Sequence, residues 1–196
     1  SQIELRVLAH LSQDQGLLEA FRRGEDIHAS TASLMFEVPI NQVTPDMRRV
    51  AKVLNFGVVY GLSPHGIAQQ TELNREDGAR FIETYFSKYP GIQSYLEGVK
   101  AKARETQFVE TLLGRRRYVP EINASNFNVR GAAERMTINM PIQGTAADIM
   151  KLAMVRVHRR LEQEKLRTKM LLQVHDELVF EVPQEELEAL KRVVLD

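Results

Sequence analysis

Four residues with complementary chemistry recur at four-residue spacing in the segment MRRVAKVLNFGVVYG: Arg48, Lys52, Phe56 and Tyr60. Each step turns only about 40° around an α-helix, so the four side chains share one face in a stripe about 18 Å long. The stripe begins with two cations, which can neutralise phosphate oxygens, and ends with two aromatic rings, which can stack on a base or ribose. This order indicates a nucleoside triphosphate site. The alternative is an amphipathic helix with its aromatic residues in the core and its cations at the rim.

A second cluster, His175-Asp176-Glu177, lies between the apolar runs 170–174 and 178–182. The runs predict two strands around a tight turn. Adjacent carboxylates repel one another unless a cation is near them, and hard oxygen ligands suit magnesium. Phosphoryl-transfer enzymes use such carboxylates to hold two metal ions. The alternative is a plain polar turn, because Asp and Glu are common in turns.

Two weaker signals lie elsewhere in the chain. The run of arginines at 115–117 follows Gly114 and could clasp a nucleic-acid backbone. Glu4 would share a face with Gln2 and Arg6 if the opening residues form a strand, although a solvated side chain is the alternative.

The elements that must position these residues follow from the apolar patterns. Ile3, Leu5 and Val7 alternate with polar residues and predict a strand over 2–7. A strand pair is expected near 108–112 and 117–119, and Pro141 should kink or break a long final helix over 129–165. Helices are expected over 14–23, 27–36, 45–60, 63–70, 75–88 and 90–106, with Thr44 and Asn74 as caps of the third and fifth. The fold class is therefore α+β, predominantly helical, with a small antiparallel sheet.

The bulk composition excludes some classes of protein. The 26 basic and 26 acidic residues cancel, so the average charge does not argue for a nucleic-acid partner. Local basic clusters at 48–52, 115–117 and 156–160 can bind phosphates or be solvated helix faces. The absence of cysteine excludes disulfides and thiolate metal sites and fits a reducing cytoplasm, where we expect the protein. No apolar stretch is long enough to span a membrane. Both ends fall inside regular elements, which predicts a segment of a longer chain.

The motifs together resemble one family. SQIELR at 1–6, RRVAKVLNFGVVYG at 48–61 and QVHDE at 173–177 are similar to motifs A, B and C of A-family DNA polymerases. TLLGRRRYVP at 111–120 and NMPIQGTAADIMK at 139–151 resemble further family segments. The motifs occur in the family's order over essentially the whole chain. Within the family, the chain resembles bacterial, Taq-like enzymes of the DNA polymerase I type.

The resemblance implies a cupped-hand architecture. Residues 1–14 would be a palm segment with the motif A strand, 15–128 the fingers, and 129–196 the rest of a truncated palm. The implied reaction joins a deoxynucleotide (from a dNTP) to a primer 3′ hydroxyl with two Mg²⁺ ions. The implied partners are primer-template DNA and dNTPs, and the parent enzyme would be a monomer.

The resemblance also implies roles for single residues. The catalytic residues would be Asp176, Glu177 and Lys52, with Asp176 as the metal ligand. The nucleotide-binding residues would be Glu4, His28, Arg48, Lys52, Phe56 and Tyr60. The DNA-binding residues would be Arg115, Arg116, Arg117, Arg135, Asn139, Gln143 and His175.

One departure from the family pattern stands out. The motif A aspartate, which should bind both metals, would precede Ser1 by two residues, so we expect this chain alone to be inactive. Two rival functions remain: a non-catalytic nucleic-acid-binding module, and an A-family RNA polymerase. The Glu4 position and the GRRR and QGTAAD segments favour the DNA enzyme. A small-molecule phosphotransferase is disfavoured because no P-loop is present.

Overall fold

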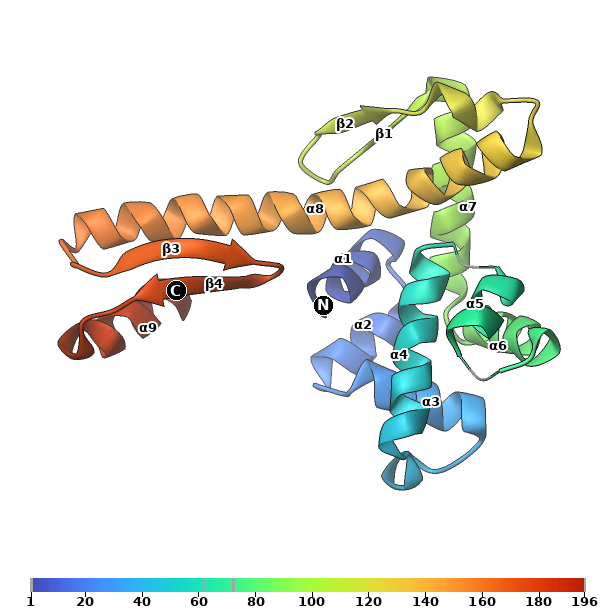
Figure 1. Ribbon diagram of the computed structural model, residues 1–196, viewed down its shortest axis with the longest axis horizontal. Coiled ribbons are helices and arrows are strands. Elements are labelled where there is room, and N and C mark those ends of the chain that lie inside the picture. The colour runs from blue at the N-terminus through green and yellow to red at the C-terminus, as the bar shows by residue number, and fades with distance from the viewer. Residues whose placement is uncertain (1, 62, 72, 196) are drawn as a thin grey trace.

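The computed structural model describes residues 2–61, 63–71 and 73–195. Ser1, the first residue of the segment that resembles motif A, lies outside them. A long helix, α8 (Phe127–Gln163), runs along the longest axis of the molecule (Figure 1).

In the described residues, a short strand pair precedes α8 and a hairpin follows it. Of the described α-helices, seven lie before α8 and one lies after it. They are α1 (Gln2–Ser12), α2 (Gln15–Arg22), α3 (Ile27–Phe36), α4 (Pro45–Val59), α5 (Pro64–Gln70), α6 (Arg75–Lys88), α7 (Pro90–Thr106) and α9 (Leu187–Leu195). The strands are β1 (Phe108–Glu110), β2 (Arg116–Tyr118), β3 (Lys169–Val174) and β4 (Glu177–Glu181), and short 3₁₀ turns span Ile40–Gln42, Pro120–Asn123 and Gln184–Glu186. The predominantly helical fold predicted from the sequence is confirmed.

Side-chain caps explain where several helices begin. The Thr44 hydroxyl accepts a hydrogen bond from the Met47 N–H (3.2 Å), and Asn74 accepts one from Asp77 (2.8 Å), as predicted. Asp14 and Asp26 cap α2 and α3 in the same way. These caps satisfy backbone donors that the first helical turn leaves without partners.

The predicted strand over 2–7 is wrong, because these residues form α1. The buried positions are Leu5, Val7, Leu8 and Ala9, and the spacing of Leu5, Leu8 and Ala9 is that of a helix face. Within the described residues, β1 pairs only with β2 and β3 only with β4, in two separate antiparallel sheets.

Pro141 does not break α8, which is one α-helix from Phe127 to Gln163. A proline inside a helix removes one backbone donor and crowds the preceding turn. The axis of α8 bends in its N-terminal part, which agrees with the kink predicted from the sequence (Figure 1).

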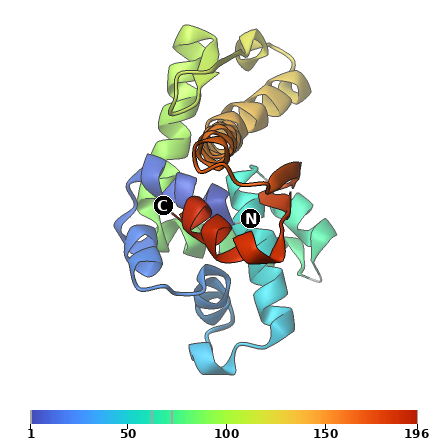
Figure 2. The same ribbon diagram turned by 90° about the vertical axis from the view of Figure 1, so that its left-hand side faces the viewer.

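Three buried clusters hold the elements onto α8. The first packs α1, α2, α4, α6 and α7 against Ile138 and Ile142. The second lies under β1 and β2. The third joins Val157 and Leu161 of α8 to Leu190 and Val193 of α9 below the β3–β4 hairpin. In the view turned by 90°, α8 is seen nearly end-on, with α3 and α4 at the opposite end of the molecule from β1 and β2 (Figure 2).

None of the helices in the described ranges is both long and apolar enough to cross a membrane.

Candidate active site

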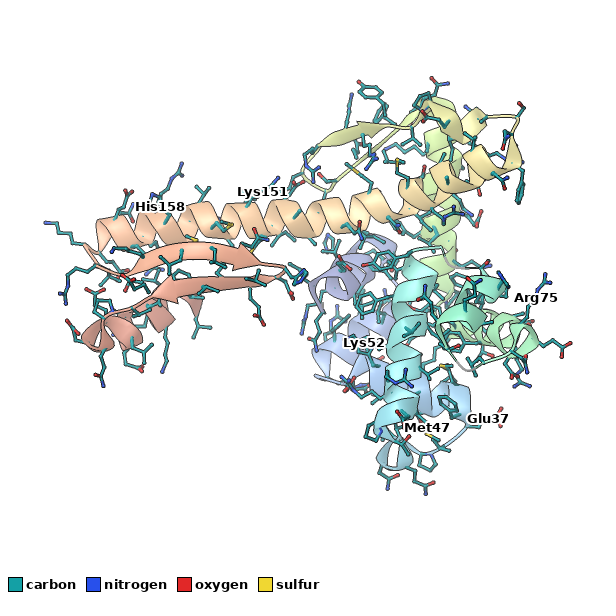
Figure 3. The ribbon with its side chains drawn as sticks, viewed as in Figure 1. Glu37, Met47, Lys52, Arg75, Lys151 and His158 are labelled. Carbon is teal, nitrogen blue, oxygen red and sulfur yellow. The ribbon has the colours of Figure 1, made fainter. Side chains whose placement is uncertain are left out.

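The predicted stripe on α4 exists. Ala51, Leu54, Asn55, Val58 and Val59 are buried on one face of the helix. Arg48 and Lys52 are exposed on another face, and Phe56 and Tyr60 are half-buried. Figure 3 labels Lys52 near the middle of the helix. The helix ends at Val59 with Tyr60 as its C-cap, and Gly61 follows with φ +68°, a conformation that favours glycine.

The cationic end of the stripe faces α3. Arg48 Nε donates to Asp26 Oδ2 at 2.7 Å. Partial burial alone would raise the pKa of Asp26, but the hydrogen bonds from Arg48 and the Ala29 N–H outweigh it and lower that pKa. Burial lowers the pKa of His28, and the positive charge of Arg48 lowers it further. Lys52 makes no ion pair with any residue that the structure describes.

The aromatic end continues from His28 to α1. The His28 and Phe56 ring centroids are 5.7 Å apart, and Phe56 stacks on Tyr60 at 6.1 Å with an interplanar angle of 20°. The Tyr60 hydroxyl donates to Glu4 Oε2. Burial, assisted by this hydrogen bond, raises the pKa of Tyr60 to about 12. Tyr60 therefore stays protonated at neutral pH and remains a donor to Glu4.

The predicted hairpin is confirmed, with Val174 paired to Glu177 across a two-residue turn. His175 has φ +51°, and its carbonyl accepts a hydrogen bond from Gln173 Nε2 (2.7 Å). The side chains of Asp176 and Glu177 are exposed. Across the described ranges, neither carboxylate has a hydrogen-bonding or ion-pair partner. Both are thus available to a ligand.

One cavity of about 550 Å³ joins the two predicted sites. Its lining includes Glu4 of α1, Phe56 and Tyr60 at the end of α4, Gln143 of α8, and His175 and Asp176 at the hairpin turn. Figure 1 shows the turn of this hairpin pointing toward α1 and α4. Residues from four distant parts of the sequence therefore line one space, with the stripe's cations beyond its aromatic end.

The donor set for a metal ion is incomplete within the described residues. No group of three His, Cys, Asp or Glu side chains there could hold an ion. The exposed, unpaired carboxylate of Asp176 has the right chemistry for a hard cation, but a single carboxylate is not a site. A metal ion bound there would need further oxygen donors besides those of the described residues.

The predicted DNA-binding residues on α8 line different spaces. Gln143 faces the cavity just described. Arg135 lines another cavity of about 610 Å³, together with Gly61, Ser63 and Phe127. Asn139 lines neither, and its Oδ1 is buried without a protein partner.

The three predicted arginines after Gly114 differ in their contacts. Arg115 Nε pairs with Asp148 Oδ1 at 2.8 Å, and its Nη2 donates to the Gly144 carbonyl at 3.0 Å. Arg116 pairs with Glu110 at 3.3 Å. The Arg117 side chain has no hydrogen-bonding or ion-pair partner among the residues whose positions are given. Arg115 thus attaches the turn after β1 to α8, and Arg117 is the most available of the three to a ligand.

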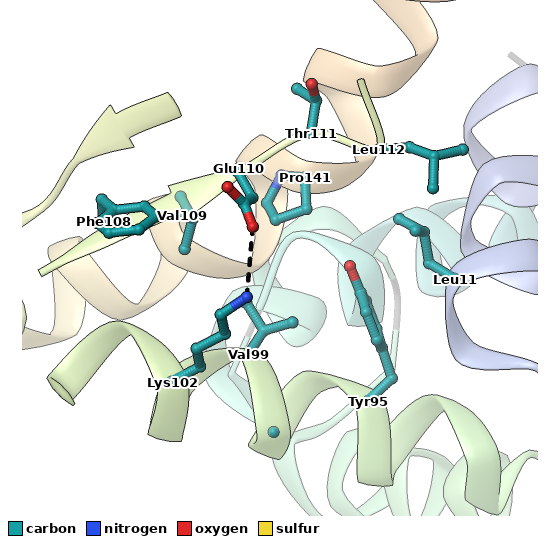
Figure 4. Close-up of a pocket in the computed structure, with 11 residues that line it drawn as sticks. Leu11, Tyr95, Val99, Lys102, Phe108, Val109, Glu110, Thr111, Leu112 and Pro141 are labelled. Carbon is teal, nitrogen blue, oxygen red and sulfur yellow. Dashed lines mark hydrogen bonds and ion pairs between the residues drawn. The ribbon is translucent and has the colours of Figure 1, made fainter. Parts of the chain in front are cut away.

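A further cavity of about 340 Å³ lies between α1, α7, β1 and α8 and contains none of the predicted site residues (Figure 4). Its walls are mostly apolar, and the ion pair of Lys102 with Glu110 (3.4 Å) crosses it. We therefore do not assign it to the active site.

Sequence reasoning missed Asp26, Asn55 and Asp148, each of which contacts a predicted site residue. Asn55 had a visible signal, because it shares the apolar stripe of α4 at helical spacing. Asp26 and Asp148 had none, since their partners are distant in the sequence.

Comparison with known proteins gives a consistent result. The family model described as DNA polymerase family A matches residues 1–196. DNA polymerase I of Bacillus caldotenax is 54% identical over 194 residues, which cover 99% of this chain and 22% of that protein. The thermostable DNA polymerase I of Thermus aquaticus is 54% identical over 193 residues, covering 98% of this chain and 23% of that protein.

A solved structure agrees with these sequences. The polymerase domain of Pol1 from M. smegmatis, in complex with DNA primer-template and dNTP, superposes with a TM-score of 0.95 at 49% identity. The match covers 99% of this chain and 34% of that one. The chain spans about a fifth of the length of the curated relatives named above. Since the family model matches every residue from 1 to 196, this chain belongs to DNA polymerase family A.

Proposed function

We propose that this chain carries the nucleotide-binding surface and part of the catalytic centre of a DNA-directed DNA polymerase. The reaction is transfer of a nucleotidyl group from a dNTP to a primer 3′ hydroxyl, with release of pyrophosphate. The observation that supports the proposal is the cavity of about 550 Å³, whose lining includes Phe56, Tyr60, Glu4, His175 and Asp176. A base and sugar would occupy that cavity, and the phosphates would extend along α4 toward Lys52.

The contacts of the stripe support separate roles for its residues. Arg48 and Lys52 would bind the triphosphate, with His28 beside them, and Lys52 would also act in catalysis. Phe56 would pack on the sugar and base. The tyrosine that ends α4 would stack near the templating base, and its bond to Glu4 would hold that carboxylate where it excludes a ribose 2′ hydroxyl.

DNA would bind along α8 and the hairpin. Its proposed ligands are Arg115, Arg116, Arg117, Arg135, Asn139, Gln143 and His175. The solved relative contains both DNA primer-template and dNTP, which supports the same partners here. Arg115 would act mainly through the turn that it anchors, because Asp148 and Gly144 already occupy its guanidinium.

We propose Mg²⁺ as the metal, two ions in all, with Asp176 as a ligand and Glu177 nearby. Bound metal ions would stabilise charge on the transferring phosphate. The remaining ligands would come from residues beyond those described. We assign residues 1–14 and 129–196 to the palm and 15–128 to the fingers. The first palm segment contains the helix α1 and not the strand predicted over 2–7. The whole protein would act as a monomer in the cytoplasm.

The direct test is Asp176→Ala in the whole protein. Primer extension should fall by several orders of magnitude, because a metal ligand is lost, whereas DNA affinity should stay within a few-fold. Asp77→Ala is the matched control. Asp77 does not line the cavity of about 550 Å³ and pairs with Arg80 on α6, so its replacement should leave primer extension unchanged. Near-normal extension by Asp176→Ala would refute the proposed centre.

The main rival is a nucleic-acid-binding module without catalysis. Such a module does not need the triphosphate stripe. If the whole protein binds dNTP and Lys52→Ala abolishes that binding, the non-catalytic module is disfavoured. An RNA polymerase would instead prefer ribonucleotides, which competition between dNTPs and rNTPs would reveal. We also propose that a polypeptide of these 196 residues has no primer-extension activity, because its described residues provide no complete metal site.

A further inference from the structure

A buried asparagine lies directly behind the proposed triphosphate site. Asn55 precedes Phe56 on α4 and falls on the buried face of the helix with Leu54, Val58 and Val59. Its exposed fraction is 0%. A polar side chain among apolar ones must find hydrogen-bonding partners or destabilise the fold.

Both ends of the Asn55 carboxamide are used. Thr31 Oγ1 donates to Asn55 Oδ1 at 3.1 Å, and Asn55 Nδ2 lies 2.9 Å from His28 Nδ1. Thr31 and His28 belong to adjacent turns of α3 and are 0% and 8% exposed. The three side chains therefore form a chain of hydrogen bonds across the α3–α4 contact.

This chain selects one form of the histidine ring. An amide nitrogen only donates, so His28 Nδ1 must be unprotonated and accept. A neutral ring then carries its hydrogen on Nε2. Burial and the charges of Arg48 and Lys52 lower the pKa of His28, although Asp26 opposes them, so the ring is neutral at pH 7.

The opposite edge of the ring is available to a ligand. Nε2 forms no hydrogen bond with any residue described by the structure, and it is not among the buried atoms left without a partner. The ring lies beside Phe56 at 5.7 Å, at the boundary between the cationic and aromatic parts of the stripe.

We propose that Asn55, held by Thr31, is a positioning residue: it fixes His28 as the neutral Nε2–H tautomer and aims that N–H at a phosphate oxygen of the bound nucleotide. The inference rests on the proposed nucleotide site and assigns to it two residues that do not touch the ligand. A neutral donor adds a hydrogen bond without a third positive charge that would repel Arg48 and Lys52 in the free protein.

The tautomer can be measured without any nucleotide. In the whole protein with ¹⁵N-labelled histidines, the His28 ring signals are assigned by their loss in His28→Gln. At pH 7.5 we expect Nδ1 unprotonated and Nε2 protonated. Asn55→Leu should give a mixture of tautomers, and Thr31→Val, which keeps the shape, a smaller change in the same direction. An Nδ1–H ring in the wild type, or unchanged ring signals in Asn55→Leu, would overturn the proposal.

A binding cycle separates positioning from simple stabilisation. Asn55→Leu should weaken dNTP binding by about tenfold, the value of one hydrogen bond to a charged group, and should add nothing in a His28→Ala background. Equal losses in both backgrounds would show that Asn55 only holds the helices together, contrary to the proposal. Val59→Ala shortens another buried side chain of α4 and should leave the His28 tautomer unchanged. A wild-type protein that binds no dNTP would refute the proposed function while leaving the tautomer result intact.

Discussion

The carboxylate of Asp26 makes contacts in two directions. Oδ1 accepts hydrogen bonds from the backbone N–H groups of His28 (3.0 Å) and Ala29 (3.2 Å), and so begins α3. Oδ2 accepts from Arg48 Nε of α4. One side chain thereby caps a helix and holds a cation of the proposed triphosphate site.

Two substitutions at Asp26 should separate these roles. Asn can still cap a helix, so Asp26→Asn should lower stability only slightly, because exposed ion pairs contribute about 0–1 kcal/mol. Asp26→Ala also loses the cap and should cost about 1 kcal/mol more. Thermal unfolding of the two variants measures the difference, and equal Tm values would contradict the capping role.

The same residue gives a pH dependence with a defined sign. The pKa of Asp26 is lower in the folded protein than its ordinary value. Its contribution to stability is therefore present above about pH 4 and is lost as pH falls through the lowered folded pKa. The difference in Tm between the wild type and Asp26→Asn should narrow over this acid range. A difference that stays constant from pH 7 to pH 3 would exclude the effect.

At the scale of elements, the contact of the β1–β2 turn with α8 depends on a glycine. A Cβ at Gly144 would lie 2.7 Å from Thr111 Cγ2 and 3.1 Å from Arg115 Nη2. Arg115 and Asp148 pair across this contact, and the Thr145 hydroxyl accepts from the Leu112 N–H at 3.0 Å. These bonds form only if the β1–β2 turn lies close to α8, and the absence of a Cβ at Gly144 allows that close approach.

Gly144→Ala should therefore destabilise the protein by about 1–3 kcal/mol, because a well-packed contact must open. Gly98→Ala is the matched control: Gly98 is also inside a helix, α7, and nothing lies within 4 Å of its added Cβ. That change should stabilise by about 0.5–1 kcal/mol through the unfolded state. If thermal or denaturant unfolding ranks the two variants the other way, the packing argument fails.

Helices and strands could be predicted from the sequence where the apolar pattern extended over many residues and a capping residue marked the start of the helix. Thr44 and Asn74 fixed the starts of α4 and α6, and the apolar runs around His175 fixed the second hairpin. The prediction for residues 2–7 was wrong because Ile3, Leu5 and Val7 fit a short strand as well as a helix. Only the next apolar residues, Leu8 and Ala9, distinguish the two patterns.

Candidate site residues followed from the sequence better than their partners did. Tyr60 and Asp176, which the sequence singled out, line one cavity. The pairs Asp26–Arg48 and Asp148–Arg115 were not predicted, because they join residues that are 22 and 33 positions apart. Such contacts depend on how α3, α4, α8 and the β1–β2 turn pack, and no local pattern encodes that.

At the scale of the whole molecule, the three buried clusters differ in size. Among the described residues, the first cluster contains nineteen buried residues from α1 to α8, whereas the third contains Val157, Leu161, Leu190 and Val193. The β3 side chains of Leu171, Leu172 and Val174 are exposed on the hairpin. A two-stranded sheet with an uncovered apolar face is marginal by itself, so we predict that contacts elsewhere in the whole protein stabilise the hairpin.

Hydrogen exchange of a polypeptide of these 196 residues tests this uneven stability. Amides of α4 and of the middle of α8 should exchange slowly, because their hydrogen bonds open only when the large cluster does. Amides of β3 and β4 should exchange at least about tenfold faster, since opening the hairpin exposes little buried surface. In the whole protein the same amides should be protected, because their apolar side chains would then be covered. Equal protection of the hairpin and α4 in the 196-residue polypeptide would show instead that the hairpin and α9 are stable on four buried residues alone.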